Sequence, residues 1–386
     1  MRVIDYDSTN FEIKNYVIAK IIKINQIKDY FEYIITFHKD YKLKRGIIVY
    51  KSSLNKGNII KTSKDPLLHI GDILEITNDK KIILQLSYNS NDNSLLVNNH
   101  CNLKCINCPQ VNNIPLKGLE IKNKKIIDFL DNKYNQIGLT GGEPTLNIDY
   151  LARLISQIYK KNNAINIDIL TNAINLAKYN NFQKLNKILK QNVTFCIALY
   201  ADIPEIHDYL TGIKGSFFET INAMHTIASY KRNIELRFVI NKINFNRLPQ
   251  FIQFAYDHFP YIDRIALMAM EYSGQAKINA QKLFIKQSDY AQYLFDAIKS
   301  AKQRNQNIFI YNHQTCKLPS KIWEYCVPTI SDWKNIYLPK CNECDFKTEC
   351  GGFFDTSDKN YIEYDVNPIK ILIKNKLETK NETMEK

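Results

Sequence analysis

The sequence has no long apolar run, and no apolar stretch follows the single arginine near its N-terminus. A helix that crosses a bilayer needs about 20 mostly apolar residues, and a secretory signal needs a short apolar segment behind a basic start. We therefore expect a cytoplasmic protein with no membrane segment. In that compartment disulfides are rare, and clustered cysteines more often bind metal or carry out redox chemistry.

Arginine is scarce beside lysine, although the formal net charge is +13. Arginine is the residue expected for bidentate recognition of bases and phosphates. Neither an arginine-rich arm nor a basic ribbon with interleaved aromatic residues is present. We attribute the charge to a lysine-rich surface and expect no nucleic-acid partner. The 386 residues, with 45% hydrophobic content, are enough for a buried core and for more than one domain.

The first 100 residues lack cysteine, and they also lack helical periodicity. Short runs rich in Val, Ile and Tyr are separated by Asn, Lys and Gly, which is typical of strands joined by turns. We predict a small β-rich N-terminal domain over residues 1–92, with its strands ending at residue 86 and a polar linker over residues 87–93 leading into the next part of the chain. Its predicted strands cover residues 16–24, 30–37, 46–51, 72–77 and 81–86.

After this segment, strand and helix patterns alternate six times, which favours an α/β fold with a parallel sheet. Functional groups of such a sheet belong at the carboxyl ends of its strands. We assign residues 93–305 to this core, 306–368 to a cysteine-containing C-terminal extension and 369–386 to a charged tail that we expect to be disordered. The predicted core strands cover residues 95–99, 136–140, 165–173, 193–201, 234–240 and 264–270.

The loop after the first core strand, HCNLKCINCPQ (100–110), holds Cys101, Cys105 and Cys108. A structural zinc site needs four ligands, and His100 adjoins Cys101 too closely to bend round the same ion. A thioredoxin-type motif would carry only two cysteines. An iron–sulfur cluster fits better, because four irons held by three thiolates leave one iron without a protein ligand. An open position of this kind is what a reactive metal centre needs.

The Cys-x3-Cys-x2-Cys loop after the first strand of a β/α series resembles the radical S-adenosylmethionine (SAM) superfamily. A second motif, Gly141-Gly142-Glu143-Pro144, follows the second strand, where that superfamily carries its GGE motif. The resemblance implies a partial (β/α)6 barrel and a [4Fe-4S] cluster held by the three cysteines. It further implies that SAM binds the open iron and is cleaved reductively to methionine and a 5′-deoxyadenosyl radical.

The same resemblance implies a set of SAM-binding residues at the strand ends. No residue is assigned as a catalytic acid or base. His207 and Asp208 are open between a proton acceptor, a peptide contact, a surface turn and a helix cap. We interpret Cys196, in the middle of a strand, as a small buried apolar residue. The SAM-binding residues implied are Gly141, Gly142, Glu143, Thr171, Asn172 and Arg237, the last pairing with the SAM carboxylate.

A second group, Cys341-x2-Cys344-x5-Cys350, lies near the C-terminus, with Cys316 and Cys326 upstream. From spacing alone, four thiolates could close either a structural zinc site or a fully liganded iron–sulfur cluster. The stretches 311–319 and 330–354, together with the cysteine loop, resemble the C component of the radical SAM maturases of the His-Xaa-Ser peptide system. That resemblance implies an auxiliary [4Fe-4S] cluster held by Cys316, Cys341, Cys344 and Cys350, with Cys326 as a spare thiol.

The resemblance therefore predicts an enzyme that modifies a ribosomally made precursor peptide bearing His-Xaa-Ser repeats. It implies two further partners, a second radical SAM protein of the same system and an external electron donor. Two other classes stay open. One is a radical SAM enzyme acting on RNA or on a small molecule. The other is a non-enzymatic scaffold in which both cysteine groups bind structural zinc.

Overall fold

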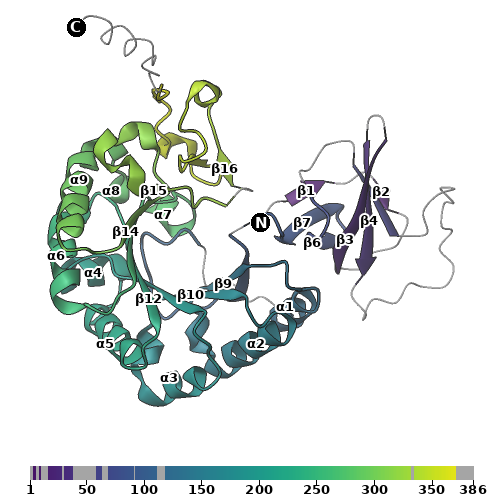
Figure 1. Cartoon of the computed structure of the whole chain (residues 1–386), viewed down its shortest axis with the longest axis horizontal. Helices are drawn as coiled ribbons and strands as arrows, with labels where there is room; N and C mark the ends of the chain where they lie inside the picture. The colour runs from purple at the N-terminus through teal and green to yellow at the C-terminus, as the bar shows by residue number, and fades with distance from the viewer. Residues whose placement is uncertain are drawn as a thin grey trace, which may run out of the picture.

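The computed structural model describes residues 3–5, 8–9, 16–27, 30–37, 58–62, 68–90, 92–110, 118–331 and 334–370. The predicted strand over 46–51 and residues 371–386 of the predicted tail lie outside these ranges. Within them, no helix is long and apolar enough to cross a membrane. The described chain contains a parallel sheet with its helices, an antiparallel sheet near the N-terminus and a C-terminal extension with little regular structure (Figure 1).

The parallel sheet has eight strands in the described chain, and each strand pairs with its successor from β8 to β15. The sheet curves, and the helices lie along its outer side (Figure 1). The strands are β8 Ser94–Asn98, β9 Gln136–Gly141, β10 Asn166–Thr171, β11 Val193–Ala198, β12 Asn233–Val239, β13 Arg264–Met268, β14 Ile308–Tyr311 and β15 Cys326–Val327. The helices are α1 Leu119–Ile127, α2 Ile148–Lys161, α3 Tyr179–Asn186, α4 Pro204–Thr211, α5 Ser216–Ser229, α6 Leu248–His258, α7 Gly274–Ile278, α8 Ala280–Leu283 and α9 Gln287–Gln303.

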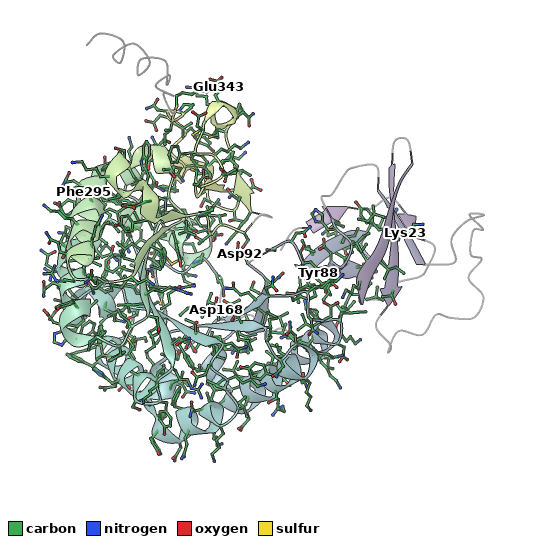
Figure 2. The ribbon with its side chains drawn as sticks, in the orientation of Figure 1. Lys23, Tyr88, Asp92, Asp168, Phe295 and Glu343 are labelled. Carbon is green, nitrogen blue, oxygen red and sulfur yellow. The ribbon has the colours of Figure 1, made fainter. Side chains whose placement is uncertain are left out.

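Alternation along the strands divides the sheet into an apolar face and a polar face. In β10, Ile167 and Ile169 are fully buried in the main core. Asp168, between them, points to the opposite side, because successive side chains of a strand face opposite ways. Figure 2 shows Asp168 on the inner, concave side of the curved sheet. Helix packing therefore stabilises the outer face, and the inner face is left for polar groups.

The prediction of an α/β fold with a parallel sheet is confirmed, and the six predicted strands correspond to β8–β13. The alternation of strands and helices was expected to end after residue 305. This was wrong, because the later strands β14 and β15 extend the parallel sheet. These two strands have four and two residues. Strands this short are held by pairing with a neighbour, and they show no period in the sequence.

The N-terminal sheet is antiparallel and has seven strands in the described chain, in the order β1-β7-β6-β3-β4-β5-β2. Ile18, Ile73 and Leu86 join the main core, and Lys20 Nζ donates to Asp131 at 2.7 Å. The sheet is therefore packed against the beginning of the β/α region. Its strands are β1 Val3–Asp5, β2 Ser8–Thr9, β3 Tyr16–Ile27, β4 Tyr30–Phe37, β5 Asn58–Thr62, β6 Ile73–Thr77 and β7 Lys81–Leu86.

The C-terminal extension lies beside the carboxyl ends of the last core strands. Lys334 forms an ion pair with Glu271 at 2.7 Å, and the backbone N–H of Asp358 donates to the carbonyl of Tyr272 at 3.0 Å. These contacts fix the extension on the loop after β13. Its regular elements are β16 Asn335–Ile336 and β17 Phe353–Phe354, which pair antiparallel, and the 3-10 turns η4 Thr315–Lys317, η5 Ser320–Tyr325, η6 Pro339–Glu343 and η7 Lys359–Tyr361.

Candidate functional site

The three-cysteine loop is held in place by backbone hydrogen bonds to two other parts of the core. The N–H groups of Lys104 and Ile106 donate to carbonyls at the end of α4, each at 2.9 Å. The carbonyl of Cys108 accepts from the N–H of Ala276, in α7, at 2.9 Å. The loop therefore has a fixed shape that does not depend on its side chains.

The thiols of Cys101, Cys105 and Cys108 lie close enough to interact electrostatically. Burial, with the Glu143 carboxylate and the Cys108 thiolate, raises the pKa of Cys101 to about 11. Burial, with the other two thiolates, raises the pKa of Cys105 further. Three thiolates so placed repel one another, so a cationic centre is needed to hold them ionised. The N–H groups of Leu103 and Gln110 point at the sulfurs of Cys101 and Cys108, each at 3.4 Å.

The donor set fits a four-iron cluster better than it fits one metal ion. Across the described ranges, no three His, Cys, Asp or Glu side chains gather closely enough to hold a single ion. A four-iron cluster binds each thiolate through a different iron and so holds the thiolates further apart. N–H groups directed at sulfur are also the usual surroundings of such clusters. Cys101, Cys105 and Cys108 would hold it.

The two glycines of the GGEP motif allow the turn after β9 to pack directly against the cysteine loop. A Cβ on Gly142 would lie 2.2 Å from the carbonyl oxygen of His100, and one on Gly141 would lie 2.3 Å from that of Asn98. The N–H of Glu143 donates to His100 O at 2.7 Å. Neither glycine has a positive φ. Glycine is thus needed at both positions because the two backbones approach each other closely. It is not needed for a positive φ, since neither residue adopts one.

Gly142→Ala is expected to lower SAM cleavage by about 100-fold, because the added methyl group forces the backbone beside Cys101 to move. The measurement is 5′-deoxyadenosine formed by anaerobically reconstituted protein, with iron per chain determined on the same sample. Gly138→Ala is the matched control, in the strand β9 that leads into this turn, since its Cβ would make ordinary contacts at 3.4 Å and beyond. Equal rates in the two variants would contradict this account of the turn.

The Glu143 side chain joins the GGEP turn to the end of β10. It is fully buried and accepts from Thr145 N–H and from its hydroxyl at 2.9 and 2.6 Å, from the Thr171 hydroxyl at 2.5 Å and from Asn172 N–H at 2.7 Å. Burial raises the pKa of this carboxyl, and the four donors act against that rise. Because both carboxylate oxygens already accept hydrogen bonds, Glu143 contributes to the site by holding the GGEP turn against the end of β10.

Asn172 links this turn back to the cysteine loop. Its side-chain amide donates to Asn102 Oδ1 at 2.8 Å and points at the sulfur of Cys101 at 3.9 Å. Five of the predicted SAM-binding residues therefore lie in one hydrogen-bonded unit with the loop. Those five are Gly141, Gly142, Glu143, Thr171 and Asn172.

Arg237 lies apart from that unit, in a charged group on the inner face of the sheet. Its guanidinium and that of Arg264 both pair with the carboxylate of Glu235, which is buried. Burial raises the pKa of Glu235, but the two guanidiniums outweigh that effect and hold it below its usual value. Cys196 is buried as expected, although its neighbours are the charged groups of this cluster rather than apolar ones.

Three further residues of this site were not found from the sequence. Asn98 Nδ2 donates to the carbonyl of Glu143 at 2.8 Å, Asn102 accepts from Asn172, and the Tyr200 hydroxyl donates to the sulfur of Cys105. Asn98 and Tyr200 lie at or just beyond the carboxyl ends of β8 and β11, which is the signal that could have singled them out.

The structure separates the roles of His207 and Asp208. Asp208 accepts from the N–H groups of Gly215 and Phe217 at 2.5 and 2.9 Å, so it caps helix α5. His207 is buried against Tyr200, and its Nδ1 accepts from the N–H of that residue at 3.1 Å. No partner for its Nε2 lies within the described residues.

Two buried histidines predict a loss of stability in mild acid. Burial lowers the pKa of His207 and His313 to about 4, from 6.5. Between these values the unfolded chain binds protons that the folded chain does not, so their stabilising effect is complete above pH 6.5 and is lost as pH falls. We expect the free energy of unfolding of the apoprotein to fall by about 3 kcal/mol between pH 6.5 and 5.

Denaturant titrations of the apoprotein at several pH values measure this dependence. The variant carrying both His207→Gln and His313→Gln is the comparison, and its dependence over the same interval should be clearly shallower. Parallel pH profiles for the two proteins would contradict the assignment to these histidines.

The C-terminal cysteines predicted to share a site also line one cavity. Cys316, Cys341, Cys344 and Cys350 surround it together with residues 366–369. Cys326, on β15, is not among the lining residues, and burial raises its pKa to about 12. By donor chemistry four thiolates suit either a fully liganded cluster or a zinc ion, but within the described residues these four do not gather closely enough to hold a single ion, so the wider spacing of a cluster fits them better.

A family model described as a 4Fe-4S single cluster domain matches residues 93–199, which include the cysteine loop, the GGEP turn and the end of β10. An uncharacterised protein of Methanocaldococcus jannaschii is 31% identical over 166 residues, 42% of this chain and 56% of that protein. The Fe-coproporphyrin III synthase of Methanosarcina barkeri is 23% identical over 252 residues, 63% of this chain and 58% of that enzyme.

These matches support the resemblance of this chain to the radical SAM superfamily. This chain spans a little over half the length of those two curated relatives. Among solved structures, Streptococcus suis SuiB bound to S-adenosylmethionine is 20% identical with a TM-score of 0.45, over 59% of this chain and 51% of SuiB. The protein anSMEcpe with bound AdoMet and a peptide is 16% identical with a TM-score of 0.46, over 71% of this chain and 92% of that protein.

Proposed function

We propose that this chain is a radical SAM enzyme that modifies a ribosomally made precursor peptide with His-Xaa-Ser repeats. One observation carries the enzyme part of the proposal. A loop with three thiols is joined by backbone hydrogen bonds to the GGEP turn and through Asn172 to the end of β10. That unit provides three ligands for a cluster, and carboxyl strand ends are where substrates of such sheets bind. The peptide part rests on the resemblance of residues 311–319 and 330–354.

When bound, the cluster and SAM supply the electron and the 5′-deoxyadenosyl radical that takes a hydrogen atom from the substrate. The residues of this chain supply position and environment. Cys101, Cys105 and Cys108 hold the cluster, and Gly141 and Gly142 bring the next turn against it. Glu143, Thr171 and Asn172 fix the adjoining strand end where SAM would lie.

Arg237 is the proposed partner of the SAM carboxylate. Because its Nε already donates to Glu235, this role requires the other edge of the guanidinium to face SAM. The proposed external partners are an electron donor and a second radical SAM protein acting on the same precursor. The proposed second cluster is held by Cys316, Cys341, Cys344 and Cys350.

The test is an anaerobic assay of the reconstituted chain with dithionite, SAM and a synthetic precursor peptide. We expect 5′-deoxyadenosine and methionine, together with a mass change in the peptide. A peptide in which each His and Ser of the repeats is replaced by Ala is the control and should stay unmodified. SAM cleavage without any change in the precursor would keep the radical SAM assignment and contradict the proposed substrate.

A small-molecule substrate is the second candidate, because the match to Fe-coproporphyrin III synthase extends over 63% of this chain. Iron coproporphyrin III is the product named for that enzyme, so the discriminating measurement is SAM cleavage with an iron tetrapyrrole precursor of it in place of the peptide. Stimulation by the tetrapyrrole and none by the peptide would favour this candidate. An RNA substrate has only the basic charge in its favour, and a salt-dependent RNA complex would be its signature.

A further inference from the structure

The segment that follows η7 crosses the cavity of the four C-terminal cysteines. Val366, which is buried, and residues 367–369 form one wall of that cavity. Figure 2 labels Glu343 in the turn that carries Cys341, at the outer end of the extension. The cavity therefore lies in the extension itself, away from the loop at Cys101.

The segment also makes polar contacts with two of the four thiols. The backbone N–H of Ile369 donates to the sulfur of Cys344 at 3.3 Å, and the N–H of Asn367 donates to the sulfur of Cys316. In return, the carbonyl of Ile369 accepts from the N–H of Asp345 at 2.9 Å. Residues 367–369 are thus aligned on the cysteine turn by donors and acceptors in both directions.

The other end of the segment is tied down by Lys317, the residue after Cys316. The Lys317 side chain is 9% exposed. Its ammonium group donates to the carbonyl oxygen and to a carboxylate oxygen of Asp365, both at 2.6 Å. It also lies 3.8 Å from the carboxylate of Glu363, which accepts from Gln287 N–H at 2.6 Å. The segment is therefore attached at both ends and crosses the thiols between them.

We propose that residues 365–369 form a strap that completes the C-terminal site as a closed, four-thiolate [4Fe-4S] cluster. The strap donates N–H groups to two ligand sulfurs and covers the cavity. Four cysteines and a cover leave no coordination position for a substrate, so the site holds its cluster for electron transfer or for stability. This inference rests on the proposed function in one respect, that the four cysteines bind iron and sulfide.

The test compares two substitutions of Ile369 in the full chain. Ile369→Pro removes the N–H that is directed at Cys344, and Ile369→Ala keeps that N–H and shortens the side chain. Both are made with Cys101, Cys105 and Cys108 changed to Ala, so that the iron counted belongs to the C-terminal site. The readouts are iron per chain, the rate of iron release to an added chelator and the reduction potential of the cluster.

Loss of an outer hydrogen bond to a metal ligand commonly costs about 10–100-fold in metal binding. We expect Ile369→Pro to release iron at least about tenfold faster than Ile369→Ala, and to have a lower reduction potential, because N–H donors to sulfur stabilise the reduced cluster. Equal release rates and equal potentials in the two variants would overturn the strap. Zinc in place of iron in this background would overturn the cluster.

Circular dichroism checks that the proline variant is folded. If it is not, Lys317→Met is used for the test, because it releases the Asp365 end of the strap and leaves every backbone N–H of residues 365–369 in place. Faster iron release from that variant than from its parent supports the strap, and an equal rate overturns it. Failure of the proposed function appears separately, as an absence of SAM cleavage by the chain with all its cysteines.

Discussion

Cys105→Ala is expected to reduce SAM cleavage to the background seen without enzyme. Removing this thiol leaves two protein ligands for the cluster of the loop, so a second iron is left without a protein ligand besides the one that binds SAM. Cys105 also accepts the hydrogen bond from Tyr200 and lies between the other two thiols in the sequence. No other Cys lies near enough in the loop to replace it. The measurement is 5′-deoxyadenosine formed anaerobically with dithionite, per chain and per minute.

Cys326→Ala is the matched control, since its sulfur points at the carbonyl of Ile322 and lies outside both cysteine groups. We expect that variant to cleave SAM at the rate of the unmodified chain. Cleavage that survives Cys105→Ala would mean that the loop does not hold the reactive cluster.

Glu235→Gln is expected to lower the free energy of unfolding by about 3–5 kcal/mol, because it leaves two guanidiniums on the inner face of the sheet without their shared counter-charge. The carboxylate is 1% exposed and pairs with both Arg237 and Arg264. Removing one member of such a group costs more than the group itself contributes, since the remaining charges stay desolvated. Denaturant unfolding of the apoprotein, followed by circular dichroism, measures the change.

Glu324→Gln provides the comparison for the same chemical change at the surface. That carboxylate is 66% exposed and lies 3.9 Å from Lys302, a geometry worth about 0–1 kcal/mol. A cost for Glu235→Gln as small as that for Glu324→Gln would show that the inner charges are well solvated. Such a result would also remove the argument that Glu235 fixes the orientation of Arg237.

Much of the site could be predicted because its residues are close together in the sequence. Cys101, Cys105 and Cys108 occupy one loop, and Gly141 to Pro144 form one turn after a strand. Period and spacing report such local groups directly. The strands β8–β13 could be predicted for the same reason, since each has at least five residues with a clear apolar pattern.

The features that escaped prediction depend on contacts between distant residues. Asn98 meets Glu143 across 45 positions, and Arg264 meets Glu235 across 29. A lone Asn at a strand end or a Glu within a strand has no signature of its own. The short strand β14 exists because β13 offers a paired edge. Such partners become visible only when the fold is known.

The central claim is that Cys101, Cys105 and Cys108 hold one four-iron cluster, independent of the C-terminal cysteines. The most direct measurement counts iron per chain after anaerobic reconstitution, beside the variant with all three changed to Ala. The account predicts about eight irons falling to about four. Four falling to none would keep the loop cluster and contradict the second one. Zinc in both samples, with iron in neither, would contradict the account as a whole.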